Sequence, residues 1–336
     1  MTEKKPKIYF LGAGAFAVPV LEKIARSQTL DLVGAGTQPD RAAGRKRILT
    51  PSPLGRWADE NGVPCERVPS VNSEEFPRRI AELGTQMIVV VSFGQILKET
   101  LLNLTPFGCL NVHASLLPKY RGASPIKSAI LNGERYTGVS FMKMDKGLDT
   151  GPVYESVGME LPSDADAAVM ENRLACLAAD RIERCIEKIV EGKLVPEPQN
   201  HEIATVSRKI RKCDGAVDWR EDAVILERKV RAYRKWPTVS FGIPQKGRVI
   251  HAKITAASCT SWEAPGGTTP GKFIAYVNNK MMISCGRGAL ILERILPEGK
   301  KEMSVADFLN GSRLAVGDIL LNGQPVTPGP DSGSSH

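Results

Sequence analysis

The chain has 336 residues, of which 42% are hydrophobic and 24% are charged. These proportions are ordinary for a globular protein and exclude a chain that is disordered throughout. At about 100–200 residues per domain, the length predicts two domains with cores large enough to need no disulfides or metals. No window approaches about 18 apolar residues, and the start MTEKKPK leads directly into an apolar strand, so we expect neither a membrane span nor a signal peptide.

The net charge of +8 favours an anionic partner, which would be a nucleic acid, a phosphorylated ligand or an acidic membrane. The seven cysteines are scattered, with no C-x-x-C pair, and this pattern is typical of reduced thiols in a cytoplasmic protein. Neither the cysteines nor the four histidines have a zinc-binding spacing, so we expect no metal.

The first half of the sequence alternates buried strands with amphipathic helices. This order predicts an α/β domain, over residues 1–193, with a mostly parallel sheet. Short apolar runs predict strands at 8–11, 30–36, 87–91 and 109–113, and longer periodic runs predict helices at 18–27, 73–83 and 165–192.

The pattern changes after residue 193. Residues 194–213 include a proline-containing stretch with few apolar clusters, which predicts a linker. Residues 214–323 contain a helix followed by short strands between Gly and Pro turns, which indicates a small β-barrel or sandwich domain. The stretch 324–336 has the composition of a disordered tail. The predicted helix is 223–232, and the predicted strands are 249–256, 271–277, 281–284 and 289–295.

The candidate catalytic residues lie near the end of the predicted strand 109–113. Asn111 and His113 are two residues apart, so their side chains project from the same face of the strand. Ligands of open α/β sheets bind at the carboxyl ends of the strands. Asp149 follows in the Gly- and Asp-rich stretch DKGLDTG, and its carboxylate could orient a histidine.

An amide, an imidazole and a carboxylate suit acyl transfer without a covalent intermediate. An amide and a protonated imidazole can hold the oxyanion that forms when an amine attacks a formyl carbon, and histidine can move the proton. The sequence contains neither a G-x-S-x-G nucleophile elbow nor a P-loop. From the spacing alone, a buried and merely hydrogen-bonded His113 remains an equal alternative.

The runs NVHASLLPKYRG (111–122), SPI (124–126) and MDKGLDTG (144–151) resemble the signature of the 10-formyltetrahydrofolate-dependent formyltransferases. The resemblance implies a Rossmann-like catalytic domain, a folate co-substrate, and Asn111, His113 and Asp149 as catalytic residues. It also implies two groups of residues around the folate. Ser115, Leu116, Leu117 and Pro118 would line its site, and Phe93, Ile96 and Leu97 would border its pterin ring, although ordinary core packing is the alternative for these last three.

The stretch 37–47 inserts four basic residues and one acidic residue after the second strand, a composition that suits contact with a phosphate backbone. It resembles the TQPDR-x-x-GR loop of the family members that formylate methionyl-tRNA. That resemblance implies that Arg41 and Arg45 reach the acceptor end and that Lys46 and Arg47 contact phosphates. A solvated basic loop is the alternative.

The second domain also resembles the β-barrel (OB-like) domain that those members use to bind tRNA. Residues 208–235 contain ten Lys and Arg against five Asp and Glu. Together the resemblances imply formyl transfer from 10-formyltetrahydrofolate to the amino group of methionyl initiator tRNA, by a monomer of bacterial cytoplasmic type. Three positions depart from the family pattern, namely Ala15, Ala42 and Val206.

Three rival functions stay open. The run GAGAFA (12–17) fits the dinucleotide-binding pattern, but the second strand lacks the acidic residue expected at its end, so a tight turn explains these glycines better. A formyltransferase acting on a small-molecule amine would keep the same catalytic residues without needing the basic segments. A non-enzymatic RNA-binding protein would not need Asn111, His113 and Asp149.

Overall fold

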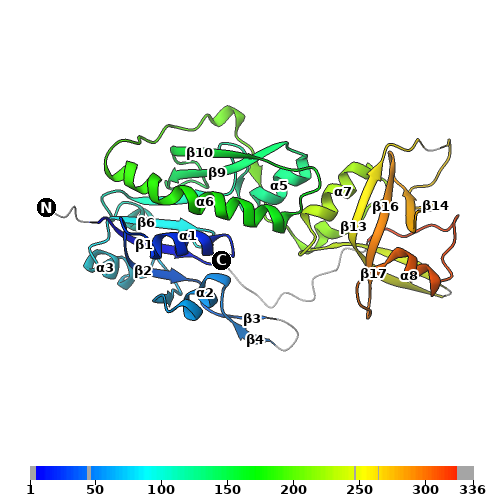
Figure 1. Ribbon diagram of the computed structural model, residues 1–336, viewed down its shortest axis with the longest axis horizontal. Coiled ribbons are helices and arrows are strands. Elements are labelled where there is room, and N and C mark those ends of the chain that lie inside the picture. The colour runs from blue at the N-terminus through cyan, green and yellow to red at the C-terminus, as the bar shows by residue number, and fades with distance from the viewer. Residues whose placement is uncertain (1–4, 44–46, 246, 264, 324–336) are drawn as a thin grey trace. The chain divides into compact units, whose positions relative to one another are not determined.

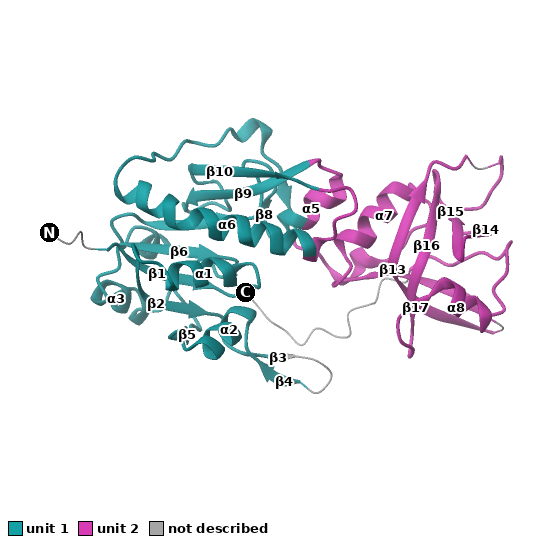
Figure 2. Ribbon diagram, viewed as in Figure 1, with its two compact units in different colours: residues 1–126, 136–161, 169–208 teal, residues 127–135, 162–168, 209–336 magenta. Residues whose placement is uncertain are grey.

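The computed structural model describes residues 5–43, 47–245, 247–263 and 265–323 (Figure 1). The chain forms two compact units (Figure 2). Unit 1 comprises Met1–Ile126, Tyr136–Leu161 and Val169–Arg208, and unit 2 comprises Lys127–Arg135, Pro162–Ala168 and Lys209–His336. The domain boundaries inferred from the sequence stay a prediction, and the predicted tail 324–336 lies outside the described residues.

Unit 1 is built on a seven-stranded sheet in the order β10-β9-β7-β6-β1-β2-β5. The five strands from β7 to β5 run parallel, and β9 and β10 extend the sheet in antiparallel fashion next to β7. The predicted mostly parallel sheet is therefore confirmed. The strands are β1 (Lys7–Gly12), β2 (Asp31–Thr37), β5 (Cys65–Arg67), β6 (Met87–Val91), β7 (Cys109–His113), β9 (Tyr136–Lys143) and β10 (Val153–Glu160).

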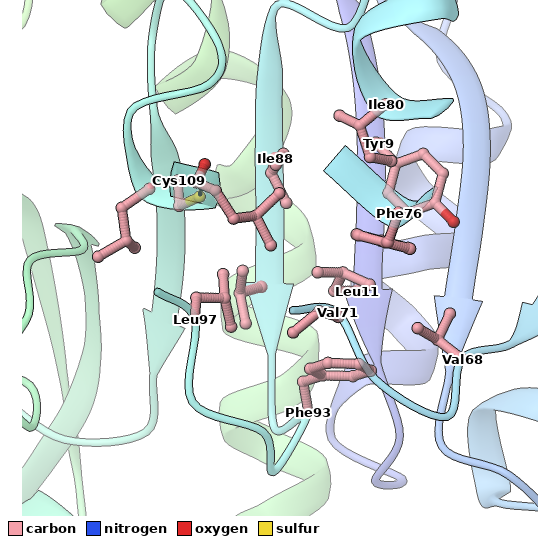
Figure 3. Packing of buried hydrophobic residues seen from close by; sticks show 13 residues of the cluster. Tyr9, Leu11, Val68, Val71, Phe76, Ile80, Ile88, Phe93, Leu97 and Cys109 are labelled. Atoms are coloured by element: carbon pink, nitrogen blue, oxygen red, sulfur yellow. Dashed lines mark hydrogen bonds between the residues drawn. The ribbon is translucent and has the colours of Figure 1, made fainter. Parts of the chain in front are cut away.

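The centre of this sheet is apolar on both faces, as parallel strands covered by helices require. All five residues of β6 are buried. On one face, Tyr9 of β1 packs edge-on against Phe76 of α3, with ring centroids 5.7 Å apart (Figure 3). The helices of the first 200 residues are α1 (Ala17–Ala25), α2 (Pro53–Asn61), α3 (Glu75–Glu82), α4 (Glu99–Leu102), α5 (Pro125–Asn132) and α6 (Ala167–Val190).

Gly12, where β1 turns towards α1, is explained by packing. A Cβ atom there would lie 2.7 Å from the Phe10 ring and 2.9 Å from the Cβ of Ala17. Both distances are shorter than van der Waals contact, so only glycine lets the helix approach the strand this closely. This close approach agrees with the tight-turn interpretation of the GAGAFA run.

Unit 2 contains an antiparallel sheet in the order β12-β13-β16-β15-β14, with the short strand β17 paired to β16. The chain segment 317–321 reaches both edges of this sheet: the amide of Gly242 donates to Leu321, and the amide of Leu320 donates to Gly271. These bonds give the sheet the barrel-like closure predicted from the sequence. The elements are α7 (Ala223–Ala232), β12 (Val239–Gln245), β13 (Arg248–Thr260), β14 (Phe273–Val277), β15 (Lys280–Ser284), β16 (Ala289–Pro297), β17 (Met303–Ser304) and α8 (Val305–Asn310).

The stretch predicted as a linker is mostly irregular, and its residues up to Arg208 belong to unit 1. It contains a 3₁₀ turn, η1 (His201–Ile203), and a two-residue strand, β11 (Val206–Ser207). β11 pairs in parallel with β8 (Arg121–Gly122), directly after the family-like motif. Within the described ranges, no helix combines the length and the apolar character needed to cross a membrane.

Candidate active site

The structure brings Asn111, His113 and Asp149 together. Strand β7 ends at His113, and the side chains of Asn111 and His113 are 9% and 7% exposed. Nδ2 of Asn111 donates to Oδ1 of Asp149 at 3.3 Å, and Nδ1 of His113 lies 3.6 Å from Oδ2 of Asp149. An amide, an imidazole and a carboxylate therefore meet at the carboxyl end of the parallel strands, while their catalytic role stays a prediction.

Both nitrogens of the His113 ring face acceptors. Nε2 lies 2.9 Å from the carbonyl oxygen of Tyr120, which can only accept, and Nδ1 faces the Asp149 carboxylate. The Tyr120 carbonyl oxygen is within hydrogen-bond distance of the ring, whereas the carboxylate oxygen at 3.6 Å lies beyond it. The ring is therefore held between a carbonyl oxygen and a carboxylate.

Asp149 adopts a left-handed backbone conformation, with φ of 52°. Asp and Asn are the non-glycine residues that tolerate this region best, and such conformations concentrate at functional sites. The backbone amide of Gly122 donates to Oδ2 of Asp149 at 2.8 Å. The carboxylate is thus fixed from the strand β8 as well as from Asn111.

The segment Ser115–Pro118, predicted to line a folate site, is held against the antiparallel strands. The hydroxyl of Ser140 accepts from the amide of Leu117 at 3.0 Å and donates to the carbonyl of Ser115 at 2.8 Å. Ser115 is buried, whereas Leu116, Leu117 and Pro118 are half-buried. This side-chain anchoring fixes the path of the segment after His113.

The segment after β6 has only one exposed member among its three predicted pterin-pocket residues. Phe93 and Leu97 belong to the buried cluster in Figure 3, as the core-packing alternative has it, whereas Ile96 is 84% exposed. The side chain of Gln95 anchors the segment by accepting from the amide of Val71 and donating to the carbonyl of Val68. Ile96 is therefore held out towards solvent at the edge of the sheet where β7 also ends.

The basic insertion forms a hairpin of β3 (Arg41–Ala43) and β4 (Ile48–Thr50). Arg41 and Arg47 are exposed, whereas Arg45 and Lys46 lie outside the described residues. The base of the hairpin is anchored because Arg67 pairs with Asp40 at 3.3 Å. Of the departures from the family pattern, Ala42 lies opposite Leu49 in this hairpin, and Val206 is an exposed residue of β11.

Reasoning from the sequence missed Gln199 and Arg121. Both are buried, and the Gln199 amide contacts the backbone of Asp149 and the guanidinium of Arg121. Gln199 follows Asp149 by fifty residues and lies in a stretch with the composition of a linker, so no local pattern indicates it. Within the described part of the chain, no group of three His, Cys, Asp or Glu side chains is arranged to hold a metal ion.

The sequence profile of the formyl transferase family matches residues 6–185, and that of the formyl transferase C-terminal domain matches residues 209–313. The methionyl-tRNA formyltransferase of Trichlorobacter lovleyi is 36% identical over 318 residues, which cover 94% of this chain and 97% of the relative. That of Sorangium cellulosum is 37% identical over 311 residues, which cover 93% of this chain and 98% of the relative. The chain belongs to the methionyl-tRNA formyltransferase family.

Among solved structures, an N-formyltransferase from Helicobacter canadensis is similar to this family member in fold, with a TM-score of 0.60 at 18% identity. The match covers 85% of this chain and 98% of the other, which was crystallised with folinic acid and dTDP-3-aminofucose. The full-length sequence matches to formyltransferases favour this family over the dehydrogenase and non-enzymatic alternatives.

Proposed function

We propose that this chain transfers the formyl group of 10-formyltetrahydrofolate to the amino group of methionine on initiator tRNA, giving N-formylmethionyl-tRNA for translation initiation. The observation that carries the proposal is the meeting of Asn111, His113 and Asp149 in a chain whose 36% identical relative is a methionyl-tRNA formyltransferase. We also propose that this chain acts as a monomer in the cytoplasm.

The three side chains divide the chemistry between them. The methionyl amine attacks the formyl carbon, a new C–N bond forms, and the bond from that carbon to N10 of the folate breaks. Asn111 and the His113 imidazolium donate to the oxygen that becomes negative. The protonated His113 ring gives a proton to the leaving nitrogen and then takes one from the attacking nitrogen, and the Asp149 carboxylate stabilises the ring while it is charged.

The folate fits the edge of the sheet where β6 and β7 end. These strands are parallel neighbours, with Val90 opposite Asn111, so the segments that follow them lie at the same edge. The first segment exposes Ile96, and the second offers the half-buried Leu117 and Pro118. Apolar surface beside hydrogen-bonding backbone is what a flat heterocycle requires.

Two basic surfaces support a tRNA acceptor over a small amine. The hairpin exposes Arg41 and Arg47, and unit 2 contains the basic stretch from 209 to 235. A small-molecule amine would need neither surface. Phosphate contacts made by these cations would give the reaction a strong dependence on salt.

The proposal is tested with His113→Gln, measured beside the wild type for formyl transfer and for binding of each substrate. Glutamine keeps a hydrogen-bond donor but cannot move a proton, so we expect transfer to fall by about 10²–10⁴-fold while folate and tRNA binding change little. Full activity of His113→Gln would remove His113 from the chemistry. Transfer to a small amine but not to methionyl-tRNA would replace the proposed acceptor.

A further inference from the structure

Gln199 makes an unusually complete set of hydrogen bonds for a residue in an irregular segment. Its side chain is 8% exposed. Nε2 donates to the carbonyl oxygens of Asp149 at 2.9 Å and Gly151 at 2.7 Å. Oε1 accepts from Nε and Nη2 of Arg121 at 3.0 and 2.8 Å. Nε2 also lies 3.5 Å from Sδ of Met142 in β9, so the donors of this amide serve the Asp149 turn and β9, and its acceptor serves one guanidinium.

The turn that Gln199 holds carries the candidate catalytic carboxylate. Asp149 has a φ of 52°, a region that costs free energy for any residue with a side chain. At Gly151, a Cβ atom would lie 1.9 Å from the carbonyl oxygen of Lys143, so the turn is packed tightly against β9. The direction of the Asp149 side chain depends on this backbone, and two of its carbonyl oxygens are fixed by one amide.

The guanidinium that Gln199 binds belongs to Arg121, whose neighbour in the chain contacts the same carboxylate. Arg121 is 7% exposed, and its Nη1 also lies 3.2 Å from Nδ1 of His201. The next residue, Gly122, donates its amide to Oδ2 of Asp149. The Asp149 carbonyl oxygen is hydrogen-bonded to Gln199, and Gln199 is hydrogen-bonded to Arg121. Arg121 precedes Gly122 in the chain, and the Gly122 amide donates to the Asp149 carboxylate, so these contacts form a closed network.

We propose that Gln199 is a positioning residue for formyl transfer, which acts by fixing the Asp149 turn and strand β8 in one register. The inference rests on the proposed function, because it assigns Asp149 a part in the reaction. Among the described residues, the hydrogen bonds of Gln199 do not include His113. In this proposal Gln199 influences the reaction rate by maintaining the distance between the Asp149 carboxylate and the His113 ring, which is 3.6 Å in the structure.

The test compares Gln199→Met with Gln86→Met as a matched control. Gln86 accepts from the amide of Lys7 at 3.0 Å, just before β6 and so at the opposite end of the parallel strands from the site. Misplacement of a catalytic group by about 1 Å costs about 100-fold in rate. We expect Gln199→Met to lower kcat by about 10- to 100-fold with the KM of both substrates nearly unchanged, and Gln86→Met to leave both near the wild-type values.

A double variant separates positioning from general destabilisation. If Gln199 acts through Asp149, then adding Gln199→Met to Asp149→Asn lowers kcat little further, whereas independent effects multiply. Should Gln199→Met fail to fold, Gln199→Glu replaces it, because it keeps acceptors for Arg121 but loses the donors to Asp149 and Gly151. Wild-type kcat in the variant that folds, or multiplying effects in the double variant, would overturn the inference. Absence of transfer by the wild-type chain would instead overturn the proposed function.

Discussion

Oδ2 of Asp149 lies 3.6 Å from Nδ1 of His113, inside a site where both side chains are largely buried. This separation is an ion-pair distance rather than a hydrogen-bond distance. The carboxylate therefore acts on the ring mainly through its negative charge. The charge of Asp149, more than its hydrogen-bonding capacity, is what the proposed chemistry requires.

Asp149→Asn tests that requirement with little disturbance of the backbone. Asparagine tolerates the left-handed conformation as well as aspartate does and keeps an acceptor for the Gly122 amide. We expect the rate constant for formyl transfer, measured in a single turnover, to fall by about 10²–10⁴-fold.

The matched control is Asp145→Asn, because Asp145 is exposed in the same loop and its Oδ1 accepts from Gly147 and Thr150. Asparagine can still accept both bonds, so transfer should remain near the wild-type rate. Equal rates for the two variants would show that the charge of Asp149 is not used.

Arg47→Ala tests the hairpin as a phosphate-binding surface. Loss of one cation that contacts phosphate should raise the KM for tRNA and reduce the slope of log kcat/KM against log salt concentration by about 1. Folate binding should not change. Arg78→Ala is the control, because Arg78 is 73% exposed on α3, away from the hairpin in sequence. An unchanged salt slope for Arg47→Ala would count against this surface.

Trp219→Ala should destabilise unit 2. The Trp219 side chain is 1% exposed, packs edge-on against Phe241 at 5.9 Å, and donates from Nε1 to the carbonyl of Leu321 at 3.1 Å. Removing such a side chain costs about 3–5 kcal/mol of the free energy of unfolding. Hydrogen exchange of the β12 and β13 amides measures this cost. The half-buried Trp262 provides the control, and an equal loss for Trp262→Ala would contradict the assigned packing.

Thiol reactivity should follow burial. Burial raises the pKa of Cys109, Cys185 and Cys285 from the ordinary 9.0 to about 12, so these thiols stay protonated at pH 8. Only the thiolate reacts, and we expect iodoacetamide to label the exposed Cys176 and Cys213 first. Labelling followed by mass spectrometry tests the order. Early labelling of a buried thiol would contradict the packing around it.

The same raised pKa values predict how stability changes in alkaline solution. Between pH 9 and 12 these thiols ionise in the unfolded chain but stay protonated in the folded chain, so the unfolded state binds fewer protons. Their contribution to stability is therefore complete below pH 9 and is lost as the pH rises through this range. Urea unfolding at pH 8 and pH 10 measures the fall.

Local patterns predicted the parts of the fold that depend on local chemistry. The bounds of β6, β7 and α7 agree with the predicted 87–91, 109–113 and 223–232, since each is a strong apolar run between clear end signals. The period of two in a strand likewise predicted that Asn111 and His113 share a face.

Features that join distant segments had no such signal. The antiparallel strand β9 was not separately predicted, because its pairing with β7 is a tertiary contact. The sequence at Phe93 and Leu97 is equally compatible with core packing and with contact to a ligand, since an apolar side chain suits both. Gln199 lies among polar and proline residues, and its proposed role depends on a hydrogen bond to Asp149, fifty residues earlier in the chain.

The most direct test of the central claim is formyl transfer from 10-formyltetrahydrofolate by the wild-type chain, measured as kcat/KM for methionyl initiator tRNA, methionyl elongator tRNA and free methionine. We predict rapid transfer to the initiator, much slower transfer to the elongator and none to free methionine. Rapid transfer to free methionine, or folate binding without transfer to either tRNA, would contradict the assignment.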